Sequence, residues 1–136
     1  MVETTGLYEG FKHCQMTHGP SQHIIHTDAP LDHDGKGEAF SPTDLVAAAL
    51  GSCMLTVMGI YADKNNIDIK GSRVKVQKEM NAAPRRIASL TVELTLPETL
   101  TIEQRRTLES VANTCPVKHS LHPEILVPIT FLYIAI

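Results

Sequence analysis

The stretch FSPTDLVAAALGSCMLTVMGIYADKNN, residues 40–66, decides the fold of this chain. Ser41, Pro42 and Asp44 are typical of a helix start. A serine side chain caps the first turn, proline suits the first helical position, and an acid near this end suits the helix dipole. We therefore predict a helix of about six turns that begins at Ser41 and ends at residue 65 or 66.

No charged residue occurs from Leu45 to Ala62, a length that reaches the lower limit for a membrane-spanning helix. The segment also contains Gly51, Ser52 and Thr56, is rich in alanine, and has no basic residues before it. We interpret it as a buried core helix, and we expect no membrane partner.

Apolar side chains lie on both sides of this predicted helix. They are Val46, Leu50, Met54, Val57 and Ile60 on one side and Leu45, Ala48, Leu55 and Met58 on the other. Such a helix must be covered all round, whereas one short helix and a few strands cover only about half of it. We expect a homodimer through this helix, with Ala47, Ala48, Ala49 and Gly51 allowing close approach. The alternative is a sheet that wraps the helix completely.

Alternating apolar residues predict strands on both sides of the helix. The expected strands are Gly6–Tyr8, Phe11–His18 and Gln22–Thr27 before it, and Arg73–Gln77, Ile87–Leu96 and Ile125–Ile134 after it. A capping box at Thr101 predicts a short second helix that stops at Pro116, and Pro128 makes the last strand an edge or interrupted strand. This order indicates an α+β fold with mostly antiparallel sheet, in a single domain over residues 1–136.

The composition indicates an ordinary globular protein, with 43% hydrophobic and 20% charged residues. The net charge is -3 and no basic cluster occurs, so we expect no nucleic-acid partner. The first residues resemble no secretory signal, and the cysteine count of 3 is odd. We expect a cytoplasmic protein with reduced, reactive or metal-binding thiols rather than a disulfide framework.

Cys53 and Cys115 are the candidate catalytic residues, whereas Cys14, in an early strand, receives no role. Cys53 lies in the middle of the long helix, where a buried structural cysteine is the simplest interpretation. Cys115 precedes Pro116, at the predicted C-terminal end of the second helix, where the dipole disfavours a thiolate. If the fold brings the two together, one thiolate can reduce a peroxide to form a sulfenic acid, which the other thiol resolves as a disulfide.

Zinc binding is the less favoured alternative use of these thiols. Cys115, His119 and His122 supply three possible ligands, and Cys53 could supply a fourth. The paired spacings that are typical of zinc sites are missing, however.

The segments FSPTDLVAAALGSCM (40–54), APRRIASLTVEL (83–94) and NTCPVKHSLHPEI (113–125) resemble the OsmC/Ohr family of thiol peroxidases. The resemblance implies an OsmC-like fold, with mostly antiparallel sheet wrapped around a long central helix, in an intertwined homodimer. It implies Cys53 as the peroxidatic thiol and Cys115 as the resolving thiol. It also implies hydroperoxide substrates and a dithiol reductant such as a lipoylated protein, with no metal or organic cofactor.

Two family features are absent. The family has an arginine in its N-terminal strands, but the first arginine here is Arg73, and Thr43 stands where the family has a glutamate. The sequence leaves open which residue activates Cys53, and the candidates are Lys12, His13, Glu38, Arg85, Arg86 and His119. The alternative function is a non-enzymatic redox sensor or small-ligand binding protein on the same scaffold.

Overall fold

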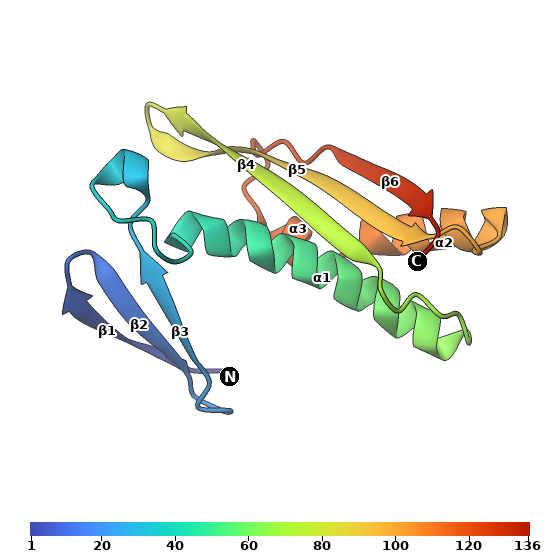
Figure 1. Ribbon diagram of the computed structural model, residues 1–136, viewed down its shortest axis with the longest axis horizontal. Coiled ribbons are helices and arrows are strands. Elements are labelled where there is room, and N and C mark those ends of the chain that lie inside the picture. The colour runs from blue at the N-terminus through green and yellow to red at the C-terminus, as the bar shows by residue number, and fades with distance from the viewer. The chain divides into compact units, whose positions relative to one another are not determined.

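The computed structural model describes residues 1–136, which form two compact units. We name them the N-terminal unit (Met1–Val46) and the C-terminal unit (Ala47–Ile136). Figure 1 shows the elements in chain order: β1 (Thr4–Gly10), β2 (His13–His18), β3 (Ile24–Asp28), the 3-10 helix η1 (Leu31–His33), α1 (Pro42–Lys64), β4 (Arg73–Ala82), β5 (Arg85–Pro97), α2 (Ile102–Ala112), α3 (Pro116–Ser120) and β6 (Ile129–Ile134). The α+β class is confirmed, and the single domain stays a prediction.

The N-terminal unit contains an antiparallel sheet in the order β1-β2-β3. A bulge at Glu9 interrupts the pairing of β1 with β2, because Tyr8 pairs with Cys14 while Gly10 already pairs with His13. Such a bulge turns a side chain out of the regular alternation of a strand. The loop after β3 returns to the sheet, since the Asp28 N–H donates to the carbonyl oxygen of Phe40 over 3.0 Å.

Helix α1 begins where the sequence predicts. The Asp44 N–H donates to the Ser41 hydroxyl over 3.1 Å, and the Ser41 N–H donates to the Asp44 carboxylate over 2.9 Å. This is a reciprocal capping box with aspartate in the acidic position. The helix continues to Lys64, one residue short of the expected end.

The C-terminal unit contains a second sheet in the order β4-β5-β6. β4 and β5 form an antiparallel hairpin, and β5 contributes the fully buried Leu90, Val92, Leu94 and Leu96. β6 pairs with β5 in parallel and begins at Ile129 rather than Ile125. Proline has no N–H to donate, and Pro128 enters the pairing only as an acceptor, from the Val92 N–H over 2.8 Å.

One stripe of α1 is fully buried: Leu50, Met54, Met58 and Ala62 are at most 1% exposed. Gly51 joins this face, and a methyl group added there would lie 3.0 Å from Val74 Cγ1 and 3.1 Å from Val76 Cγ2. Helix α1 therefore lies directly against β4, as Figure 1 shows.

By length and composition alone α1 could cross a membrane, a test that core helices of soluble proteins also pass.

The face of α1 opposite the buried stripe contains exposed residues, and these are only in part the residues that we expected at the dimer contact. Ala47 and Gly51 are buried within the chain, so the prediction that they face a partner is wrong. Between Ala47 and Ala62 the exposed helix residues are small or apolar: Ala48, Ala49, Ser52, Thr56 and Ile60. The sheet of the C-terminal unit thus covers one side of the helix rather than wrapping it.

The short helices correct the predicted position of Cys115. Thr101 and Gln104 form the expected capping box of α2, but this helix ends at Ala112. Pro116 then occupies the first turn of α3, and Cys115 is the N-cap residue of that helix. Proline suits a first helical turn, so here it starts a helix instead of stopping one.

Candidate functional site

The fold brings the side chains of Cys53 and Cys115 together. Cys53 projects from the middle of α1 and is half-buried, whereas Cys115 is 0% exposed. The thiol of Cys115 is in hydrogen-bonding contact with the side chain of Cys53, and both cysteines are free. Two sulfur atoms that are remote in the chain therefore meet at the interior side of α1.

Burial raises the pKa of the Cys115 thiol, and the hydrogen bond to Cys53 raises it further. The backbone N–H groups of Lys118 and Val117 lower it, although neither makes a capping hydrogen bond to the sulfur. The sequence prediction placed this thiol at the unfavourable end of a helix dipole, which is wrong. It lies at the favourable end of α3, but burial dominates and keeps the thiol protonated.

An apolar pocket of about 280 Å³ is lined by residues of α1 and of the end of α2, and neither Cys53 nor Cys115 lines it. Val57 follows Cys53 by one helical turn, and Thr114 directly precedes Cys115. The lining residues are Val57, Ile60, Tyr61, Lys64, Val111 and Thr114.

The residues that the sequence offered as activators of Cys53 are spread over both units, and Arg86 among them has another partner. Arg86 pairs with Glu124 and lowers the pKa of that carboxyl group. Thr43, at the position of the family glutamate, hydrogen-bonds to the Ser41 hydroxyl over 3.2 Å. Lys12, His13 and Glu38 belong to the N-terminal unit, and the backbone N–H of His119 donates to the Cys115 carbonyl over 3.2 Å.

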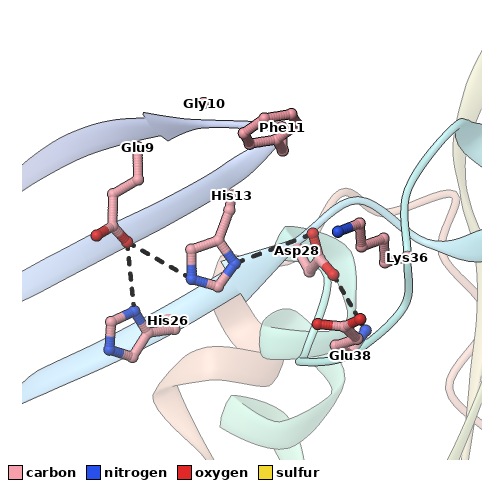
Figure 2. A pocket seen from close by; sticks show the side chains of 8 residues that line it. All are labelled: Glu9, Gly10, Phe11, His13, His26, Asp28, Lys36 and Glu38. Carbon is pink, nitrogen blue, oxygen red and sulfur yellow. Dashed lines mark hydrogen bonds and ion pairs between the residues drawn. The ribbon is translucent and has the colours of Figure 1, made fainter.

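The zinc ligands that the sequence suggested do not form a metal-binding group. The ligand atoms of these three residues do not form a cluster that could hold one ion: Cys115, His119 and His122. The His122 Nδ1 instead accepts a hydrogen bond from the Glu124 N–H over 3.1 Å. A different cluster lies in the N-terminal unit, where the ligand atoms of Glu9, His13 and His26 lie within 4.8 Å of one another. Sequence reasoning missed it, because only the strand register brings these residues together. Figure 2 shows the pocket that contains them.

Comparison with known proteins gives the family. Residues 35–130 match the family described as OsmC-like protein, and this match covers most of the chain. The chain therefore belongs to the OsmC-like family, and the resemblance seen in the sequence is confirmed. No curated protein matches the chain.

Solved structures agree with this assignment. A Psychrobacter arcticus protein named for osmotic stress induction and a detoxification response is 41% identical, with 96% of each chain covered and a TM-score of 0.91. An organic hydroperoxide resistance protein OsmC from Legionella pneumophila is 15% identical, with 97% of this chain and 96% of that chain covered and a TM-score of 0.78. A Vibrio cholerae organic hydroperoxide resistance protein with captopril in one active site is 20% identical, with 98% and 94% covered and a TM-score of 0.73. The last two share the fold alone.

Proposed function

We propose that this chain is a thiol peroxidase that reduces organic hydroperoxides or hydrogen peroxide. The contact between the thiols of Cys53 and Cys115 carries the proposal. Of the two, Cys53 is the more accessible, while Cys115 is fully buried and its pKa is raised. Because the thiolate is the nucleophile, Cys53 is the peroxidatic residue and Cys115 is the resolving residue.

The reaction has three steps. The Cys53 thiolate attacks the terminal oxygen of the hydroperoxide, an S–O bond forms, the O–O bond breaks, and the alkoxide leaves as the alcohol after taking a proton. Cys115 then attacks the sulfenic sulfur, and its proton leaves with the hydroxide as water. An external dithiol reduces the disulfide by two exchanges and is itself oxidised to a disulfide. A lipoylated protein is a suitable reductant.

The pocket lined by Val57 and Val111 supports an organic substrate, because its apolar wall suits an alkyl or aryl group. The exposed face of α1 with Ala49 and Ile60 supports a homodimer, since small residues permit close helix packing. We assign residues 1–136 to one OsmC-like domain and the protein to the cytoplasm. Neither a metal nor an organic cofactor takes part in the three steps.

Hydroperoxide consumption with dihydrolipoamide as reductant tests the proposal. Cys53→Ser should abolish turnover, and Cys115→Ser should permit one oxidation per chain before the Cys53 sulfenic acid accumulates or over-oxidises. Cys14→Ser is the matched control and should keep wild-type turnover. Mass spectrometry of the oxidised wild type should find the Cys53–Cys115 disulfide.

Sustained turnover by Cys53→Ser would contradict the proposal. Formation of the disulfide without repeated turnover would favour the alternative of a redox sensor. Alkylation of the reduced protein provides a further check, because Cys53 should react before the buried Cys115.

A further inference from the structure

The N-terminal unit holds a cluster of metal-ligating side chains that the peroxidase reaction does not use. In the β2–β3 register His13 faces Asp28, and Gln15 faces His26. Since side chains alternate along a strand, His13, His26 and Asp28 share one face of the sheet. The bulge at Glu9 places its carboxylate on the same face, as Figure 2 shows.

The three candidate ligands surround a common point rather than hydrogen-bonding to one another. Glu9 Oε1 lies 3.5 Å from His13 Nε2 and 3.6 Å from His26 Nδ1, beyond the usual length of a hydrogen bond. Zinc bonds of about 2.05 Å at tetrahedral angles separate neighbouring ligand atoms by about 3.3 Å. The two Glu9 separations therefore need to shrink by only a few tenths of an ångström to match zinc geometry, and all the ligand atoms lie within 4.8 Å of one another.

Asp28 lies beside the second ring nitrogen of His13. Its carboxylate is 3% exposed and lies 4.0 Å from His13 Nδ1, the nitrogen that faces away from Glu9. The same carboxylate accepts from the Glu38 N–H over 3.1 Å, which fixes its position. A metal-binding histidine commonly has a carboxylate at its second nitrogen, because this fixes the tautomer and raises the basicity of the ligand.

The pocket around the cluster has a volume of about 310 Å³ and suits a cation. Its lining includes three carboxylates, of Glu9, Asp28 and Glu38, against one ammonium group, of Lys36. With neutral imidazoles, these side chains have a net formal charge of −2. The two histidine rings stack, with centroids 5.3 Å apart and an angle of 23° between the ring planes.

We propose that Glu9, His13 and His26 bind one divalent first-row transition-metal ion, with Zn²⁺ the best match to two imidazoles and one carboxylate. Three protein ligands leave one tetrahedral position for water or a small anion on the pocket side. Asp28 is a positioning residue that acts through His13. The three ligands belong to the N-terminal unit and use neither Cys53 nor Cys115, so the test of this site does not depend on the peroxidase proposal.

Calorimetric titration of the full-length protein with Zn²⁺ in the presence of a non-thiol reductant tests the site. The wild type should bind one ion per chain, and His26→Gln and Glu9→Gln should each lose this binding. The control is His23→Gln, an exposed histidine three positions from His26, and it should bind Zn²⁺ as the wild type does. Equal binding by His26→Gln and His23→Gln would overturn the proposal.

Asp28→Asn should weaken Zn²⁺ binding about 10–100-fold without abolishing it. Thermal unfolding without metal shows whether each variant is folded. Should His26→Gln fail to fold, NMR of the wild type decides the matter, because Zn²⁺ should shift the ring signals of His13 and His26 and leave those of His23 unchanged. Unshifted His13 and His26 signals would overturn the proposal.

The thiols are the competing ligands for Zn²⁺. The double variant Cys53→Ser/Cys115→Ser should bind one ion as tightly as the wild type, and loss of binding in this variant would overturn the site. Co²⁺ provides a spectroscopic check, since the bound ion should give visible tetrahedral bands without the near-ultraviolet charge-transfer band of a thiolate ligand. A strong thiolate band would also contradict the proposal.

Discussion

The Cys115 thiol, buried at the start of α3, hydrogen-bonds to the side chain of Cys53 in the middle of α1. The two environments differ, because Cys53 is half-buried while Cys115 has no exposed surface. Burial makes the thiolate of Cys115 costly, and its pKa rises accordingly. Cys115 therefore keeps its proton until a partner sulfur is oxidised, which suits a resolving role.

The raised pKa of Cys115 predicts a loss of stability in alkali. The unfolded thiol ionises near 9.0 while the folded thiol retains its proton. Ionisation therefore stabilises the unfolded state relative to the folded state as pH rises. The contribution of the Cys115 thiol to the free energy of unfolding is fully present below pH 9, and it is lost as pH rises toward the pKa of the folded state. One proton changes the free energy of unfolding by at most about 1.4 kcal/mol per pH unit.

Denaturant titrations between neutral pH and pH 10 measure this effect under reducing conditions. The wild type should lose stability with pH more steeply than Cys115→Ser, whose hydroxyl does not titrate in this range. Cys14→Ser, at a half-buried thiol of the N-terminal unit, should keep the wild-type slope. Identical slopes in the wild type and Cys115→Ser would contradict burial as the cause of the raised pKa.

Local features of the fold are readable from the sequence. The start of α1 follows from Ser41 and Asp44, because a capping box depends on residues three positions apart. The sequence misplaces the end of α2, because this prediction also depends on a local signal, the proline at position 116. Pro116 is compatible both with a helix end before it and with a helix start at it, and the structure uses the second.

Long-range contacts are not readable from composition or spacing. The meeting of Cys53 with Cys115 depends on how α3 packs beside α1, and only the family resemblance suggested it before the structure. The cluster of Glu9 with His13 and His26 depends on strand register and on a bulge. A shift of register by one residue would turn His13 to the other face of the sheet, and no local pattern excludes that shift.

Two glycines of α1 provide a matched test of its packing. Glycine inside a helix costs about 0.5–1 kcal/mol relative to alanine. Gly59 has no atom within 4 Å of an added methyl group, so Gly59→Ala should raise the free energy of unfolding by about that amount. At Gly51 the methyl group would crowd Val74 and Val76, and overpacking costs about 1–3 kcal/mol. Gly51→Ala should therefore be no more stable than the wild type.

Chemical denaturation of the two alanine variants measures this difference. The expected order of stability is Gly59→Ala, then wild type, then Gly51→Ala. An equal gain in both variants would mean that α1 does not lie as close to β4 as the structure indicates. The comparison tests the helix position without changing Cys53 or Cys115.

Tyr133, in β6, combines a favourable ring contact with an unsatisfied hydroxyl group. The Arg105 guanidinium carbon lies 4.2 Å from the centre of the ring, while the buried hydroxyl makes no hydrogen bond of normal geometry, although it interacts with the Glu109 side chain. Arg105 is itself held by the carbonyl oxygens of Leu100 and Glu98, at 3.1 Å and 2.7 Å. Burial raises the pKa of Tyr133 to about 12, and the nearby Glu109 carboxylate adds to this.

Tyr133→Phe should keep the cation–π contact and remove the unsatisfied hydroxyl, whose burial costs about 1–3 kcal/mol. At neutral pH the variant should be as stable as the wild type or more stable by up to about 2 kcal/mol. The wild type should also lose stability between pH 10 and pH 12, because the unfolded phenol ionises near 10.0 and the folded one near 12, and Tyr133→Phe should lack this loss. Thermal unfolding of the wild type and Tyr133→Phe across this pH range measures the difference. Tyr61→Phe is the control for a tyrosine elsewhere in the C-terminal unit. A clear loss of stability in Tyr133→Phe at neutral pH would show that the interaction of the hydroxyl with Glu109 is stabilising.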